Sequence, residues 1–185
     1  MAALLAGAPA PLAALPTLPP EVERETILPD GADFAAAAVD EEGALDRFTA
    51  YAAALAARDY GAAYAMLRLS FQASNPRLDW EANQRKRPVL WADGRLRILR
   101  LSWYPDPAGQ APGLYAAFDF RGDRADGMMD CGYVVVHRAV PDAPFTVVRI
   151  DTSEVPPELM EEGVPKADVL RRLPCWLGKG IATAF

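Results

Sequence analysis

The spacing of hydrophobic residues along the chain changes near Gly94. Before it, apolar side chains recur every three or four residues, as in Leu45, Phe48, Ala52 and Leu55, which places them on one face of a helix. After it, apolar and polar residues alternate in four short runs, a pattern typical of strands with one buried face. Helices followed by strands predict an α+β fold.

The first half is expected to hold two helices and a short basic segment. The first helix follows the acids at residues 40–42, because negative charge stabilises a helix N-terminus. Asp59 is placed to cap the second. Residues 77–87 are predicted to form a short helix or turn, with Trp80 as its apolar anchor and Pro88 as its stop.

The four alternating runs are separated by short polar or proline-rich connections. The first run begins at Leu96 and ends before Pro105. The other three cover residues 114–120, 131–138 and 145–151. Short connections favour antiparallel neighbours, because a parallel return needs a crossover of about a dozen residues or more. We therefore expect N-terminal helices packed on a curved, mainly antiparallel sheet of four or slightly more strands.

Composition divides the chain into three parts. Residues 1–40 combine an Ala/Pro-rich leader with an acidic arm, residues 41–155 hold the patterned α+β region, and residues 156–185 form an extension. The leader resembles the apolar region and cleavage end of a secretory signal, although no basic residue precedes it. A periplasmic or secreted protein is therefore expected, with a cytoplasmic one as the alternative. No apolar stretch reaches the roughly 18–20 residues of a membrane span.

Charge is unevenly distributed. The net charge of -6 argues against nucleic-acid binding, which needs a basic surface. Residues 21–46 carry nine acids against one base, whereas residues 77–100 carry seven bases against three acids. These segments could be two solvated surfaces, an acidic arm folded onto a basic segment, or a basic segment that binds an anionic ligand.

Cys131 and Cys175 are the two cysteines of the chain. In an oxidising compartment they are expected to form a disulfide that ties the C-terminal extension to the sheet, whereas in the cytoplasm they would be thiols. The chain contains no Cys-x-x-Cys motif, and His137 is the one histidine. The sequence therefore predicts no metal site and no cofactor.

The segments 44–67 and 80–87, followed by GLYAAFDF, CGYVVVHR and FTVVRID, together resemble the nuclear-transport-factor-2-like superfamily, in the style of its bacterial domains of unknown function. The resemblance covers about residues 44–152 and implies a cone-shaped domain, in which a curved sheet wraps a long helix and leaves a pocket at the open end. The superfamily includes isomerases and dehydratases, small-ligand binders and dimerisation modules. Its fold alone does not choose among them.

A binding hypothesis follows from aromatic and basic residues, since aromatic side chains with a few polar groups suit a small-ligand cleft. The same side chains could instead pack the core. The candidate ligand-binding residues are Tyr64, Trp80, Arg87, Arg100, Trp103 and Tyr115.

An enzyme hypothesis uses Asp119 and His137 as acid and base. Apolar neighbours could raise the pKa of Asp119, which stands between Phe118 and Phe120. Alternation, however, puts Asp119 on the opposite face from these rings, where it could point to solvent or pair with Arg149. His137, near a strand end, could be an exposed or hydrogen-bonded structural residue.

Taken together, these patterns favour a non-catalytic domain of the bacterial cell envelope that binds a small molecule or a protein. The alternative is a cone-pocket enzyme of the isomerase, dehydratase or hydrolase type. The extension interleaves apolar and basic residues beyond Lys166, and it could pack on its own domain, dock a partner or support a homodimer.

Overall fold

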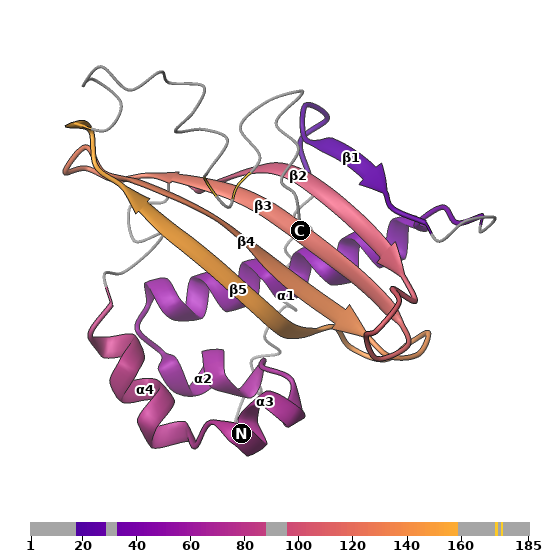
Figure 1. Cartoon of the computed structure of the whole chain (residues 1–185), viewed down its shortest axis with the longest axis horizontal. Coiled ribbons are helices and arrows are strands. Elements are labelled where there is room, and N and C mark those ends of the chain that lie inside the picture. The colour runs from indigo at the N-terminus through magenta and orange to yellow at the C-terminus, as the bar shows by residue number, and fades with distance from the viewer. Residues whose placement is uncertain (1–17, 29–32, 88–95, 159–172, 174, 176–185) are drawn as a thin grey trace, which may run out of the picture.

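The chain forms an α+β structure of helices and one mixed sheet (Figure 1). A computed structural model describes residues 18–28, 33–87, 96–158, 173 and 175. The helices are α1 (Ala38–Ala56), α2 (Tyr60–Ala65), α3 (Leu69–Ser74) and α4 (Arg77–Arg85). The strands are β1 (Glu23–Thr26), β2 (Leu96–Pro105), β3 (Leu114–Asp123), β4 (Met129–Arg138) and β5 (Thr146–Val155).

The sheet is a four-stranded antiparallel meander with one added parallel strand. Its spatial order is β1-β2-β3-β4-β5. The pairs from β2 to β5 are antiparallel, as the short connections predicted, and β1 pairs with β2 in parallel. The sequence pattern did not predict β1, because its four residues, Glu-Arg-Glu-Thr, carry no apolar alternation. This strand is held through its backbone at the edge of the sheet.

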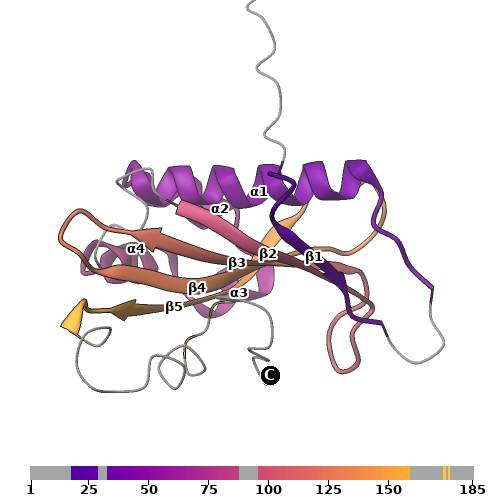
Figure 2. The same cartoon turned by 90° about the horizontal axis from the view of Figure 1, so that it is seen from above.

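The long helix α1 lies along one face of the sheet (Figure 2). Its predicted apolar stripe is buried there, with Leu45, Phe48 and Ala52 in the core. Phe48 stacks on Phe118 of β3 with 4.9 Å between ring centroids. The strands alternate as expected, so every second residue of β3 and β4 faces this helix, including Phe120 and Val134.

The three short helices gather beyond the β5 edge of the sheet (Figure 1). Asp59 caps α2 as predicted, accepting a 3.0 Å hydrogen bond from the backbone of Ala62. The chain then runs beside β5, where the backbones of Arg68 and Val147 are hydrogen-bonded at 2.9 Å. Residues 77–85 form the predicted short helix α4 with Trp80 buried. Pro88 lies outside the described residues.

A second, smaller core surrounds the disulfide. Cys131 of β4 and Cys175 form the predicted bond, with 5.3 Å between their Cα atoms. Met129 and Val155 pack beside it. The bond therefore joins residue 175 to the sheet, while residues 1–17 and most of the extension lie outside the described residues. Within the described ranges, no helix is both long and apolar enough to cross a membrane.

Gly132 of β4 is required by a close approach to β5. A Cβ atom at this position would lie 2.1 Å from the carbonyl oxygen of Asp151. Gly132→Ala is therefore expected to lower the free energy of unfolding by about 1–3 kcal/mol, because the two strands would have to separate. Urea unfolding followed by circular dichroism measures this change.

Gly43→Ala is the matched control for that variant. A Cβ at Gly43 would meet the Phe145 ring at 3.6 Å, an ordinary contact, and alanine is the better helix former by about 1 kcal/mol. The control is expected to be neutral or stabilising. Equal stability of both variants and the parent protein would contradict a tight approach at Gly132.

Candidate functional site

A pocket of about 310 Å³ lies between α1, α2, α4 and the edge strand β5. We call it the α4 pocket. Most of its walls are aromatic or aliphatic, and its polar groups are three amides, the hydroxyls of a threonine and two tyrosines, and two arginines. The described lining residues are Tyr51, Leu55, Tyr60, Leu67, Phe71, Asn75, Trp80, Asn83, Gln84, Arg87, Val147, Val148, Arg149, Ile150 and Thr152.

Tyr51 forms part of the inner wall. Its side chain comes from α1 and is 1 % exposed. Burial raises the pKa of the Tyr51 hydroxyl well above its ordinary value, and the positive charge of Arg87 partly opposes this shift. Tyr51 is not one of the residues predicted to bind a ligand, although it stands three residues after Phe48, at a spacing that fits the buried stripe of α1.

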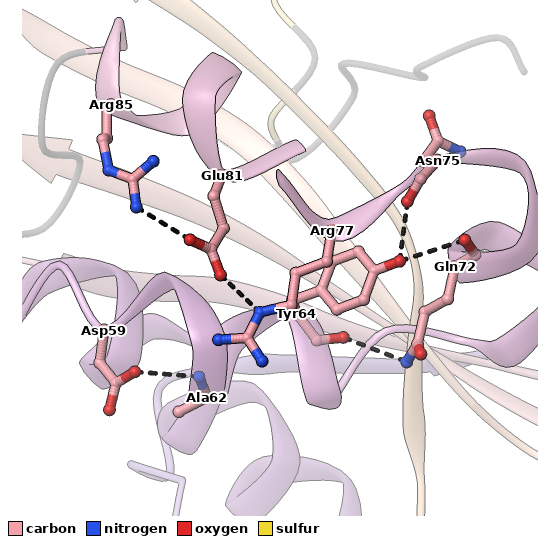
Figure 3. Close-up of polar contacts among 8 residues, drawn as sticks. All are labelled: Asp59, Ala62, Tyr64, Gln72, Asn75, Arg77, Glu81 and Arg85. Atoms are coloured by element: carbon pink, nitrogen blue, oxygen red, sulfur yellow. Dashed lines mark hydrogen bonds and ion pairs between the residues drawn. The ribbon is translucent and has the colours of Figure 1, made fainter. Parts of the chain in front are cut away.

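Trp80 forms the wall contributed by α4 and is supported from behind by Tyr64. The centroids of the two rings are 5.5 Å apart. The Tyr64 hydroxyl lies 2.7 Å from the carbonyl oxygen of Asn75, and the Gln72 amide donates to the carbonyl oxygen of Tyr64 (Figure 3). Trp80 therefore lines the pocket as the binding hypothesis required, whereas Tyr64 positions Trp80 and is not among the lining residues.

The basic residues of α4 differ in their pairing. Glu81 accepts from Arg77 at 2.6 Å and from Arg85 at 2.8 Å, each one helical turn away (Figure 3). The hydrogen bond from Arg77 lowers the pKa of the Glu81 carboxyl. The Arg85 guanidinium also lies 5.4 Å from the centroid of the pocket residue Tyr60. Both arginines are therefore partnered within the helical layer.

Arg87 follows α4 and lines the pocket as predicted. It makes no ion pair with any residue that the structure describes. The other lining arginine, Arg149, places its guanidinium 5.3 Å from the centroid of the Tyr133 ring, which alternation puts on the sheet face away from α1. Among the described lining residues there is no Asp, Glu or His. Arg87 and Arg149 therefore make the described lining positively charged, and Arg87 is the one of the two without a described ring or ion-pair partner.

Arg100 and Asp119 are joined on the face of the sheet away from α1. Their side chains are each 7 % exposed and form an ion pair of 2.8 Å. Glu25 of β1 lies 3.0 Å from Arg100, so one acid of the N-terminal arm does contact the basic segment. Burial raises the pKa of Asp119, and the hydrogen bond from Arg100 opposes this shift. The expectation that Asp119 points to solvent or pairs with Arg149 was wrong.

Tyr115 and His137 form a third group, also away from the α4 pocket. Their ring centroids are 4.2 Å apart with the rings tilted by 35°, and His137 Nε2 lies 3.0 Å from the carbonyl oxygen of Pro112. His137 is thus a buried, hydrogen-bonded residue. Tyr115, its partner in register, stands four residues from Asp119 along β3, a separation of about 13 Å. The structure therefore does not bring Asp119 and His137 together as an acid–base pair.

Trp103 lies elsewhere again, in the core beneath α1, where it is buried. The six candidate ligand-binding residues therefore divide among the α4 pocket, its supporting layer, the core and the opposite sheet face. Only Trp80 and Arg87 of the six line the pocket.

A second pocket of similar volume lies at the other end of α1. Its charged residues include Asp40 and Arg138, which pair with each other. Because these two charges offset each other, this second pocket is less suited to a charged ligand. Across the described ranges, no three His, Cys, Asp or Glu side chains are grouped so that they could hold a metal ion.

No family model, curated protein or solved structure matches this chain.

Proposed function

We propose that this chain is a non-catalytic domain of the bacterial cell envelope that binds a small molecule in the α4 pocket. The observation that carries the proposal is the make-up of that pocket. Tyr51, Tyr60 and Trp80 are buried and border an open volume, while amides and Arg87 stand among the lining residues. Apolar walls with a few polar groups are typical of sites for small organic molecules.

The proposed architecture is the cone of the nuclear-transport-factor-2-like superfamily. A long helix along one face of an antiparallel meander (Figure 2) and a pocket between that helix and the sheet support this assignment. The disulfide supports the proposed export to the periplasm or the cell exterior, because such bonds persist in oxidising compartments.

The non-catalytic part of the proposal rests on the position of the acid–base candidates. An isomerase, dehydratase or hydrolase of this type would hold an acid or base against its substrate. Asp119 and His137 lie on the other sheet face and contact Arg100 and Tyr115 instead. These contacts give Asp119 and His137 a structural role without any part in catalysis.

Binding of a neutral aromatic probe tests the pocket. We expect N-phenyl-1-naphthylamine to gain fluorescence on titration with the full chain. Trp80→Ala is expected to weaken this binding by about ten- to a hundredfold, since it removes one apolar wall worth about 1.5–3 kcal/mol. Tyr133→Ala is the matched control, because that aromatic residue lies outside the pocket lining.

A second variant keeps the test decisive if Trp80→Ala unfolds. Asn83 is an exposed lining residue, so Asn83→Trp can obstruct the pocket without opening a cavity in the core. It is expected to reduce probe binding while the thermal unfolding transition is kept. Absence of probe binding to the parent protein, or full binding by Asn83→Trp, would contradict the proposal.

A further inference from the structure

We propose that the ligand of the α4 pocket is a small amphipathic organic anion. Its flat apolar body packs against Trp80 and Tyr60, and its negatively charged oxygen head lies between the Tyr51 hydroxyl and the Arg87 guanidinium. This inference rests on the proposed function and adds the chemical class of the ligand.

The Tyr51 hydroxyl is the first support. Tyr51 is 1 % exposed and lines the pocket, and its hydroxyl makes no hydrogen bond to another described residue. That hydroxyl is not one of the buried, unsatisfied polar atoms of the described residues, so it remains in contact with the open volume of the pocket and is available as a donor. A ligand oxygen in the pocket would accept a hydrogen bond from it.

Arg87 is the second support, and it is independent of the first. The arginines at the start and end of α4 share one counter-charge, Glu81, whereas Arg87 is exposed, lines the pocket and has no ion-pair partner in the described part of the chain. Its charge acts on the Tyr51 hydroxyl, so the two groups serve the same region of the pocket. A guanidinium binds carboxylate or phosphate oxygens better than neutral ones.

The remaining lining defines the body of the ligand. Leu67 and Val147 are buried beside the aromatic walls, and none of the described lining residues is an acid that would repel an anion. A volume of about 310 Å³ is at the lower end of small-molecule sites. The pocket therefore suits a body of one or two rings, with the charge at one end.

Three naphthalene probes that differ in the head group test this class. Isothermal titration in low-salt buffer compares naphthalene-2-carboxylate with the neutral naphthalene-2-methanol, and 2-naphthyl phosphate distinguishes a phosphate from a carboxylate head. We expect an anion to bind about tenfold more tightly than the alcohol, as one charge-assisted contact predicts. The anion that binds more tightly identifies the head group of the ligand as a carboxylate or a phosphate.

Substitutions at Arg87 and Tyr51 test whether these residues cause the preference for an anion over the alcohol. Arg87→Gln is expected to reduce the anion preference to about twofold or less, and Tyr51→Phe is expected to weaken the anion more than the alcohol, because a charged oxygen accepts the stronger hydrogen bond. Lys86→Gln is the matched control, since it removes the same charge from the adjacent residue, which does not line the pocket. It should leave the preference intact.

The possible outcomes separate the two proposals. Equal binding of the anions and the alcohol overturns the anionic class while leaving a small-ligand pocket. An anion preference that survives both Arg87→Gln and Tyr51→Phe also overturns it. If none of the naphthalene probes binds, and N-phenyl-1-naphthylamine does not bind either, the pocket function itself fails, and the inference fails with it.

Discussion

Replacing Arg100 by methionine is expected to lower the free energy of unfolding by about 3–5 kcal/mol. The substitution removes the guanidinium that lies 2.8 Å from Asp119 and leaves a carboxylate buried without its main counter-charge. The loss of stability is expected to be larger near neutral pH than in acid. In acid, Asp119 can be protonated, and the variant then no longer buries an unpaired charge. Urea unfolding at several pH values measures it.

Two control variants test whether the loss of stability comes from the buried, unpaired charge. Arg97→Met removes the same side chain from the same strand, but its pair with Asp123 is solvent-exposed, with Arg97 60 % exposed, so its cost should stay below about 1 kcal/mol. The double variant Arg100→Met with Asp119→Leu should recover most of the lost stability, because it removes both charges. Similar losses for Arg97→Met and Arg100→Met would contradict the importance of burial.

Removal of the disulfide is expected to cost about 4 kcal/mol. Cys131 and Cys175 are separated by 44 positions, and closing a loop of this length restricts the unfolded chain by about that free energy. The measurement compares urea unfolding of the oxidised protein with that of Cys131→Ala/Cys175→Ala.

A reducing agent supplies the control for the disulfide variant. It should lower the unfolding midpoint of the parent protein and leave that of the double variant unchanged. Coincident unfolding curves for the oxidised and reduced parent would overturn the expectation, as would two alkylatable thiols in protein purified from its native compartment.

The meander was predictable because its residues alternate in step with the pleat, whereas β1 and α3 were not. The four residues of β1 are charged or polar, and they pair with β2 through their backbone and through the side chain of Glu25, which contacts Arg100. In α3, Leu69 is 79 % exposed and Phe71 is also exposed. A helix that leaves its apolar residues in solvent has no buried stripe to recognise.

The candidate site was only partly predictable, because residue type does not show which sheet face a side chain occupies. Arg100 and Trp103 are three residues apart on β2, so they point to opposite faces. Tyr51 belongs to the periodic stripe of α1, and periodicity marks it as buried. It does not show that Tyr51 borders open space, because that depends on where α4 lies, packed on α2 and separated from β5 by the pocket.

The parallel strand β1 and the contact between Leu67 and Val147 protect the meander from self-association. Strand β2 would otherwise offer ten residues of unpaired backbone, a template for joining another chain edge to edge. Instead β1 covers part of it, and β1 itself is short and charged. At the other edge, the segment before α3 bonds to β5. We therefore expect the acidic arm to help keep separate copies of the sheet from pairing edge to edge.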